Sequence, residues 1–284
     1  MRDLSNFAVF ILTHGRPDKV ITAETLKRVG YTGAVYYIID NEDKTAEEYR
    51  ARFGSENVIE FDKPAIAQTF DTADTQNNRK TIVYARNACA GIARDLGIEY
   101  HLQLDDDYTD LLHRYREGDT ICSKAIDNFD AVVSMMLDLL EDTGALTVAL
   151  SQGGDHMGGV NGNIRRGMRR KAMNSFFIRT SRPVEFVGRI NEDVNTYVTA
   201  GARGELFFTV MALQLNQIQT QQSSGGMTDV YLSSGTYVKS FYTVMLAPSC
   251  VCIRTMGRTD RRMHHSIRWD NAVPKILSSK HRKK

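Results

Sequence analysis

Residues 81–107 read TIVYARNACAGIARDLGIEYHLQLDDD, and this stretch decides the fold class. From Ala85 onward, small and apolar residues recur at i, i+3, i+4, i+7, i+8 and i+11, which is typical of a helix buried along one side. Gly97 is placed to end that helix. Tyr100–Leu104 then alternates like a strand and runs directly into Asp105–Asp107. The stretch therefore predicts a helix followed by a buried strand with a strongly acidic end.

The same alternation of strand and helix extends toward the N-terminus. Three short β-prone runs, Phe7–Leu12, Ala34–Ile39 and Val58–Phe61, each stop at a turn signal or an aspartate. Helices are predicted between them, one starting at Pro17 and one over Thr45–Phe53 with a capping box of its first residue and Glu48. Strands alternating with helices indicate an α/β fold with a mostly parallel central sheet flanked by helices.

Polar residues gather where these strands end. They are Thr13, His14 and Arg16 after the first run, Asp40 after the second, Asp62 after the third, and Asp105, Asp106 and Asp107 after the fourth. Since a sheet of this kind binds ligands beyond the carboxyl ends of its strands, we expect these side chains to share one rim.

The aspartate triplet is a candidate metal site. Asp105 and Asp107 alternate, so both carboxylates can lie on one side and hold Mg²⁺ or Mn²⁺, whose shell is usually completed by substrate phosphates. Such a site predicts a nucleotide or other diphosphate ligand, with Asp40 bonding its ribose or base. The alternatives are a solvated acidic turn or a helix cap for the triplet, and purely local hydrogen bonds for Asp40.

The remaining sequence predicts fewer elements. A helix is expected around Phe129–Glu141 and a strand around Leu146–Leu150, followed by a mobile loop over Gly153–Gly162. Three aromatic segments with β propensity follow: residues 174–178, 205–210 and 237–245. Most of their rings belong in a core, although a ring flanked by Arg or Lys can stack an unpaired base.

Two further groups carry candidate chemistry. Glu192 and Asp193 are adjacent acids in a region that is otherwise apolar and basic, so one of them is a candidate general base, the alternative being an ion pair with a nearby arginine. His264 and His265 lie among arginines, where one of them either closes a metal shell or neutralises a leaving diphosphate, or both are surface histidines.

The net charge of +2 hides two opposite halves. Residues 1–163 carry 16 basic and 27 acidic residues, whereas residues 164–284 carry 20 and 7. A basic half indicates a polyanionic partner. The candidate residues for binding it are Arg165, Arg166, Arg169, Arg170, Lys171, Arg261 and Arg262.

Composition narrows the class of protein further. A hydrophobic fraction of 42% and a charged fraction of 25% exclude disordered, collagen-like and coiled-coil proteins. The four cysteines form no CxxC pair and are too few for a disulfide framework, and neither a signal peptide nor a run of about 18 apolar residues is present. We therefore expect a cytoplasmic protein with reduced cysteines and no membrane association.

Several motifs together resemble a known family. ILTHGRP, IDNEDKTAEEY, YARNA, QLDDDY, GRINEDVNTYV and SGTYVKSFYTVM occur in order between residues 10 and 245, and HHSIRWDNAVPKIL extends the series to residue 277. The order is similar to that of GT-A glycosyltransferases and, more closely, to the TET-associated glycosyltransferase family of bacteriophages. A DDD motif alone is weak, but this many ordered segments are specific.

The resemblance implies an enzyme that moves a sugar from a nucleotide sugar, with a UDP-sugar as the expected donor, to the hydroxymethyl group of 5-hydroxymethylcytosine in phage DNA. It implies a single GT-A-like domain over residues 1–284, with a nucleotide-sugar half (1–107), an acceptor and DNA-binding half (108–277) and a basic tail (278–284). The enzyme would act in the cytoplasm of the infected host, and no protein partner is implied.

The resemblance also assigns roles to residues. The nucleotide pocket would be lined by Thr13, His14, Arg16 and Asp40, with Arg86 and Asn87 packed behind the metal motif. The donor and the metal would be held by Asp105, Asp106 and Asp107. The acceptor would be activated by Asp193, or by Glu192 in another strand register, and His265 or His264 would be a late metal or diphosphate ligand. The reaction would be a single displacement with inversion. The target base would flip out of the duplex, with Gly153–Gly162 as lid or wedge.

Three alternatives remain open on the sequence. A metal-dependent nuclease or nucleotidyltransferase would also need acids and a basic surface. A catalytically inactive DNA-binding relative is disfavoured by the intact acidic motifs. An enzyme that adds a second sugar to an already glycosylated base cannot be separated from one that adds the first.

Overall fold

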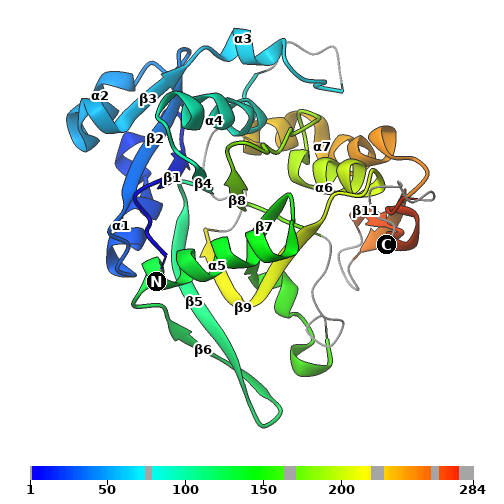
Figure 1. Cartoon of the computed structure of the whole chain (residues 1–284). Helices are drawn as coiled ribbons and strands as arrows, with labels where there is room; N and C mark the ends of the chain where they lie inside the picture. The colour runs from blue at the N-terminus through cyan, green and yellow to red at the C-terminus, as the bar shows by residue number, and fades with distance from the viewer. Residues whose placement is uncertain (1, 74–78, 163–170, 219–226, 257–261, 275–284) are drawn as a thin grey trace, which may run out of the picture.

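The structure is a computed structural model that describes residues 2–73, 79–162, 171–218, 227–256 and 262–274, without the side chains of residues 227–236, Met256 and Arg262. Within these residues, a nine-stranded sheet has the order β3-β2-β1-β4-β8-β7-β9-β5-β6 (Figure 1). Its strands are β1 (Phe7–Leu12), β2 (Ala34–Asp40), β3 (Val58–Phe61), β4 (Tyr100–Asp105), β5 (Tyr108–Glu117), β6 (Thr120–Ala125), β7 (Thr147–Gln152), β8 (Ser175–Arg179) and β9 (Phe207–Gln217).

Strand directions place several strand ends on one rim. β1 is parallel to both β2 and β4, and β2 is parallel to β3. β8 runs antiparallel to both β4 and β7, so β7 has the direction of β4, and β9 is parallel to β7. The carboxyl ends of β1, β2, β4, β7 and β9 therefore lie along the same edge of the sheet, which we call the rim.

Helices cover both faces of the sheet (Figure 1). They are α1 (Ile21–Arg28), α2 (Ala46–Phe53), α3 (Lys63–Ala67), α4 (Val83–Asp95), α5 (Phe129–Thr143), α6 (Glu192–Ala202) and α7 (Met227–Leu246). Because successive residues of a strand point to opposite faces, Val9 and Ile11 pack with α1 and α5, while Ala8 and Phe10 pack with α4 and α6. β1 is thus buried on both sides, as its apolar sequence requires.

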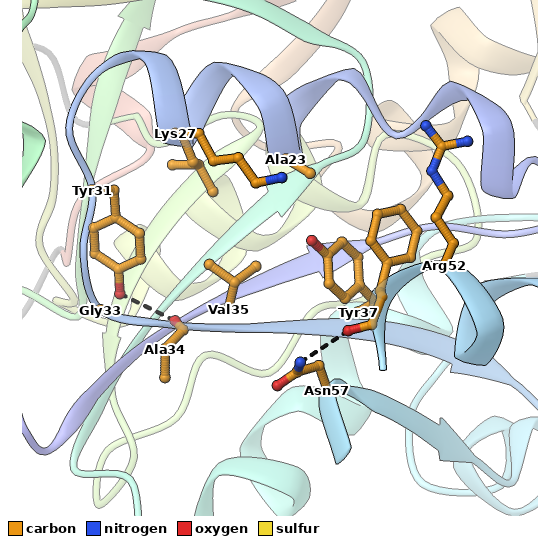
Figure 2. Close-up of a pocket in the computed structure, with 11 residues that line it drawn as sticks. Ala23, Lys27, Tyr31, Gly33, Ala34, Val35, Tyr37, Arg52 and Asn57 are labelled. Atoms are coloured by element: carbon orange, nitrogen blue, oxygen red, sulfur yellow. Dashed lines mark hydrogen bonds between the residues drawn. The ribbon is translucent and has the colours of Figure 1, made fainter. Parts of the chain in front are cut away.

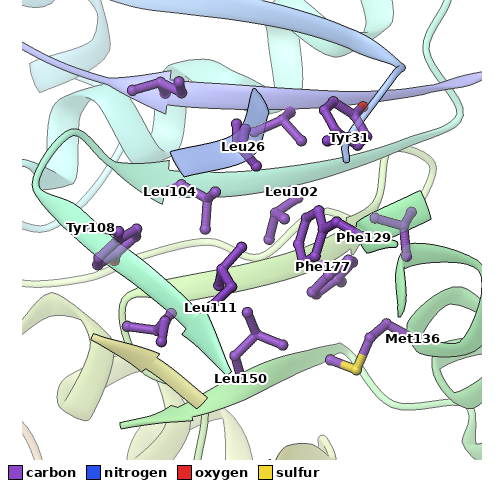
Figure 3. Close-up of a cluster of buried hydrophobic side chains, with 14 of the residues drawn as sticks. Leu26, Tyr31, Leu102, Leu104, Tyr108, Leu111, Phe129, Met136, Leu150 and Phe177 are labelled. Atoms are coloured by element: carbon purple, nitrogen blue, oxygen red, sulfur yellow. The ribbon is translucent and has the colours of Figure 1, made fainter. Parts of the chain in front are cut away.

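The first core layer fills the space between the sheet and α5. Leu102 and Leu104 of β4 meet Phe177 of β8, and Phe129 and Met136 of α5 close the layer (Figure 3). Strands from both halves of the sequence contribute to it, so the sheet joins the acidic and basic halves in one domain.

A second, two-stranded sheet stands beside α7. β10 (Val251–Met256) pairs antiparallel with β11 (Arg262–Ile267). The hydroxyl of Ser240 in α7 donates to the carbonyl of Met263 at 2.9 Å, which fixes this hairpin against the helix. No helix among the described residues is both long enough and apolar enough to cross a membrane.

The α/β fold with flanking helices is confirmed, and parallel pairing is concentrated in β1–β4 and β7–β9. The predicted strands Phe7–Leu12 and Val58–Phe61 are observed with those bounds. The helix predicted over residues 81–96 spans Val83–Asp95.

Two local predictions were wrong, and one hairpin was not foreseen. Thr45 makes no capping bond, because its hydroxyl donates to Asp43 instead at 2.7 Å. The β-prone segment 237–245 lies in α7, where packing overrides the propensity of its aromatic residues. The β5–β6 hairpin, which projects from the body in Figure 1, was not predicted. Within the predicted loop Gly153–Gly162, the structure has the 3₁₀ turns Gly153–His156 (η3) and Gly159–Asn161 (η4).

Candidate active site

The middle aspartate of the triplet faces inward. Asp106 is fully buried and accepts two hydrogen bonds from Arg16, Nε to Oδ2 at 2.8 Å and Nη2 to Oδ1 at 2.7 Å. Thr13 also donates to Asp106 Oδ2 at 2.6 Å, and the Thr13 hydroxyl contacts that of Tyr49 at 2.8 Å. Asp106 and Thr13 therefore hold Arg16 in place at the rim, and their own polar atoms are occupied within the protein.

The outer two aspartates carry the available charge. The Asp105 side chain is 24% exposed, and its Oδ1 accepts from Arg86 Nη2 at 2.9 Å. Burial, together with the neighbouring charges of Asp105 and Asp106, raises the pKa of Asp107 to about 7. The end of β4 thus concentrates more negative charge than its arginine partners neutralise.

Arg86 joins the aspartate triplet to the second acidic motif. Its side chain is 1% exposed, and besides Asp105 its Nε donates to Glu192 Oε1 at 3.1 Å. The guanidinium lies 4.9 Å from the ring centroid of Phe176 and 5.8 Å from that of Phe186. α4 therefore places one buried cation between the carboxylates of β4 and α6.

The acidic motif begins a helix and not a strand. Glu192 and Asp193 occupy the first turn of α6, where the helix dipole favours negative charge. Burial raises the pKa of Glu192 to about 7, with a further contribution from Asp193 and opposition from Arg86. Burial also raises the pKa of Asp193, whose Oδ1 accepts from the Val194 amide at 2.7 Å.

The turn before α6 explains this placement. Gly188 has φ +80°, and a Cβ there would lie 2.4 Å from Asn195 Nδ2. That amide bonds the carbonyls of Val187 and Ile190, so it shapes the turn from within. Asn191 has φ +57° and donates to the Lys239 carbonyl at 2.6 Å, which ties the start of α6 to α7.

The two histidines of β11 lie on the α7 side of the site. Burial lowers the pKa of His265 to about 4, with contributions from His264 and Lys239. Lys239 also lowers the pKa of Asp193, so its ammonium lies within electrostatic reach of both groups. His264 Nδ1 contacts the His265 carbonyl at 2.6 Å. In the described part of the chain, no three His, Cys, Asp or Glu side chains come together as a metal cluster, so Asp105, Asp107 and His265 are not gathered as a set.

A polar cluster at the end of β2 includes residues that the sequence did not suggest. Asp40 Oδ2 accepts from the buried Lys63 at 3.1 Å and lies 2.8 Å from His14 Nδ1. The bond to Asp40 raises the pKa of His14; burial alone would raise the pKa of Asp40, but His14 and Lys63 lower it. Asp43 accepts from the Gly15 amide at 2.8 Å. Lys63 is therefore part of this cluster. In the sequence, its position is indicated only by the start of a helix at Lys63-Pro64, directly after Asp62.

Asn87 is placed for a structural role. Its Nδ2 donates to the Phe186 carbonyl and its Oδ1 accepts from the Phe186 amide, both at 2.9 Å. Asn87 therefore bonds the segment that leads to α6.

The candidate DNA-binding residues are mostly outside the described part of the chain. Arg165, Arg166, Arg169, Arg170 and Arg261 fall there, as does the side chain of Arg262. Lys171 is described, and it forms an ion pair with Asp155.

One cavity of about 460 Å³ lies away from all these groups (Figure 2). It is lined by Lys27, Tyr31, Tyr37 and Arg52 among others, between α1, β2 and α2. It contains none of the predicted site residues and reaches the amino end of β2, so it is separate from the rim.

Comparison with known proteins places the chain in a family. No curated protein sequence matches it. A putative nucleotide-diphospho-sugar transferase from Desulfovibrio desulfuricans G20 is 11% identical with a TM-score of 0.43, over 86% of this chain and 94% of that chain. S. aureus TarS 1-349 in complex with UDP-GlcNAc is 12% identical with a TM-score of 0.39, over 80% of this chain and 63% of that chain. These similarities are too distant to assign a substrate.

The family model is more informative. The TET-Associated Glycosyltransferase model matches residues 7–226, which includes the aspartate triplet, Arg86 and the α6 acids. Because this match covers most of the chain, the protein belongs to the TET-associated glycosyltransferase family and is a glycosyltransferase.

Proposed function

We propose that the protein transfers a sugar from a nucleotide sugar, a UDP-sugar as the first choice, to the hydroxymethyl group of 5-hydroxymethylcytosine in DNA. The observation that carries the proposal is the bridge made by Arg86 between Asp105 and Glu192. This bridge brings the acids that could hold the metal of a donor diphosphate next to acids that could activate a hydroxyl group. Family membership makes sugar transfer the reaction and sets the nuclease alternative aside.

The polar cluster at the end of β2 suits the nucleotide part of a donor. Lys63 and His14 both contact Asp40, so the carboxylate and the imidazole have fixed orientations. His14 is 51% exposed at its side chain, which leaves one face free to contact a base or ribose. Arg16, held by Asp106, is 36% exposed and offers positive charge to a phosphate.

A divalent cation fits the end of β4. Asp105 and Asp107 supply hard oxygen ligands. The pKa of Asp107 is raised first by burial and then by the negative charges of Asp105 and Asp106, and a cation would relieve that repulsion. Mg²⁺ and Mn²⁺ need only one or two protein carboxylates when a diphosphate completes their shell, so the absence of a three-residue cluster in the described residues is compatible with the site. When bound, the cation would neutralise charge on the donor diphosphate. His265, partly buried within electrostatic reach of Lys239, is proposed as a neutral partner for the leaving diphosphate.

Asp193 is the proposed general base. Glu192 accepts from the Arg86 guanidinium, whereas Asp193 Oδ1 accepts from the Val194 amide, a neutral donor. Asp193 would accept the hydroxymethyl proton as that oxygen bonds the anomeric carbon and the bond from this carbon to the diphosphate oxygen breaks. A pKa raised by burial makes a carboxylate a better base near neutral pH. A single displacement of this kind inverts the anomeric centre.

The acceptor is proposed to be a base flipped out of DNA. A base inside the duplex cannot bring its C5 substituent to buried acids, so the nucleotide must leave the stack. Met157 follows η3 and is 66% exposed, an apolar side chain of the kind that fills a vacated base position. The basic C-terminal half supports the proposal because phosphate contacts supply sequence-independent affinity.

The test combines the protein with Mn²⁺, a panel of nucleotide sugars and DNA containing 5-hydroxymethylcytosine, followed by nucleoside mass measurement. We expect a mass gain of one sugar with intact strands. No gain with any donor would refute the proposal, and a gain only on previously glycosylated DNA would make the protein a second-sugar enzyme.

A further inference from the structure

A second polar cluster lies on the same rim, at the end of β7. Ser151 is fully buried, and the η3 turn that follows carries Asp155 and His156, each 8% exposed. Lys171 pairs with Asp155, and the Gln152 amide donates to Asp155 Oδ2 at 3.0 Å. The turn is thus held by hydrogen bonds and an ion pair, and its polar side chains point inward.

The hydrogen bonds of Ser151 fix the tautomer of His156. The Ser151 hydroxyl donates to the Leu213 carbonyl at 2.7 Å, and a carbonyl can only accept. Ser151 Oγ also lies 2.8 Å from His156 Nε2, and since its one proton is already used it must accept there. The Nε2 atom therefore carries the proton of a neutral ring, and Nδ1 presents a lone pair.

Two polar atoms of this turn are buried without partners. His156 Nδ1 has no hydrogen-bond partner in the described structure, and neither has Gln152 Nε2. The side-chain oxygen of Gln152 accepts from the Asp155 amide, so the orientation of its NH₂ group is set. One acceptor and one donor are therefore held in a single turn, each lacking the hydrogen bond that buried polar groups normally make.

The turn and the proposed base share one buried neighbour. Tyr197 of α6 is buried, which raises the pKa of its phenol, and the negative charges of Asp193 and Asp155 raise it further. Both carboxylates are therefore within electrostatic reach of one phenol group, with His156 next in sequence to Asp155. A ligand at Asp193 that extends past Tyr197 would approach η3.

We propose that His156 and Gln152 read the Watson–Crick edge of the extruded acceptor base: His156 Nδ1 accepts from the exocyclic amine of cytosine, and Gln152 Nε2 donates to ring N3. This inference rests on the proposed function, and it identifies the residues that select the acceptor base. A uracil edge presents a carbonyl and an N–H at the same two positions, so it would oppose acceptor to acceptor and donor to donor. The turn therefore selects hydroxymethylcytosine over hydroxymethyluracil.

The experiment compares matched single-stranded oligonucleotides that contain one 5-hydroxymethylcytosine or one 5-hydroxymethyluracil. Affinity is measured without donor, and kcat/KM with it, for the wild-type protein, His156→Phe and Gln152→Glu. The glutamate variant keeps the oxygen that accepts from Asp155 and replaces only the unpartnered donor. We expect the wild-type preference for the cytosine oligonucleotide to fall by at least about tenfold in both variants.

His113→Phe is the control, because this histidine lies on the exposed β5–β6 hairpin and should leave the preference unchanged. Unchanged preference in a folded His156→Phe or Gln152→Glu protein, as expected if ordered water satisfies these atoms, overturns the inference. If His156→Phe does not fold, Gln152→Glu decides alone. A cytosine preference in binding that the variants lose supports base reading even if no sugar is transferred, so the proposed function and this inference fail separately.

Discussion

Arg16 and Asp106 form a two-point ion pair in which one partner is buried and the other reaches the surface. The Asp106 side chain is 1% exposed and that of Arg16 is 36% exposed. The middle aspartate of the triplet thereby points into the protein and its neighbours remain at the rim, so three identical residues in sequence have two different roles.

Asp106→Asn should destabilise the fold. The amide cannot accept from both Arg16 nitrogens and Thr13, and we expect a loss of about 1–3 kcal/mol in the free energy of unfolding measured in urea. Asp110→Asn, at an exposed carboxylate, is the control and should change it by less than about 0.5 kcal/mol. Equal effects would mean that the buried pair has no special role.

Asp193→Asn should remove turnover and keep donor binding. Loss of a general base is expected to lower kcat by about 10²–10⁴-fold, with donor affinity unchanged in calorimetry. Glu185→Gln, an exposed acid a few residues earlier, should retain full activity. Retained turnover in Asp193→Asn would exclude it as the base.

Asp107→Asn should remove cation-dependent donor binding. The wild-type protein is expected to bind a UDP-sugar in Mn²⁺ and to lose most affinity in EDTA, whereas Asp107→Asn should bind weakly in both. The same titration with Asp110→Asn should follow wild type. Donor binding in EDTA equal to that in Mn²⁺ would contradict a metal at this position.

His101 should make the protein sensitive to mild acid. It is fully buried against Phe10, and burial lowers its pKa from 6.5 to about 3. Above pH 6.5 the histidine is neutral in both the folded and the unfolded protein. Between pH 6.5 and about 3 it gains a proton only in the unfolded protein. The free energy of unfolding therefore decreases as the pH is lowered through this range, by up to about 1.4 kcal/mol per pH unit.

His101→Leu should therefore flatten the acid side of a plot of unfolding free energy against pH. His113→Leu on the exposed hairpin should leave it as in wild type. A slope that is the same in all three proteins would show that His101 is not the source.

DNA binding should weaken steeply with salt. If basic residues neutralise several phosphates, the logarithm of the association constant should fall linearly with the logarithm of salt concentration, by about 0.7–0.9 per phosphate contact. Fluorescence anisotropy between 50 and about 200 mM salt measures the slope. A flat response would refute the phosphate-binding role of the basic half.

The sequence predicted those elements whose signal is local. β1 and β3 are short apolar runs between turn signals, and both were found with their predicted bounds. The β5–β6 hairpin lacks this pattern because its outer residues are exposed on both faces, so alternation is absent. α7 was mistaken for strand since its aromatic residues favour β structure, while its burial against β11 is a tertiary effect.

For the site, the sequence identified residue types better than partners. Asp105, Glu192 and Asp193 were singled out as acids, but only the fold shows that Arg86 lies between the first two. Lys63 and Asp40 are 23 positions apart and pair because β2 and α3 meet, a contact that periodicity does not contain. The tautomer of His156 depends on the Leu213 carbonyl of β9, and no sequence pattern predicts that this carbonyl meets Ser151.

The hydrogen bonds of Asn87 to the backbone of Phe186 have a mechanical consequence. They make the segment before α6 an extension of α4, so the parts of the chain that carry Asp105 and Asp193 have no hinge between them at this point. The separation between the acids proposed for the donor side and those proposed for the acceptor side is therefore fixed at this point by the fold itself.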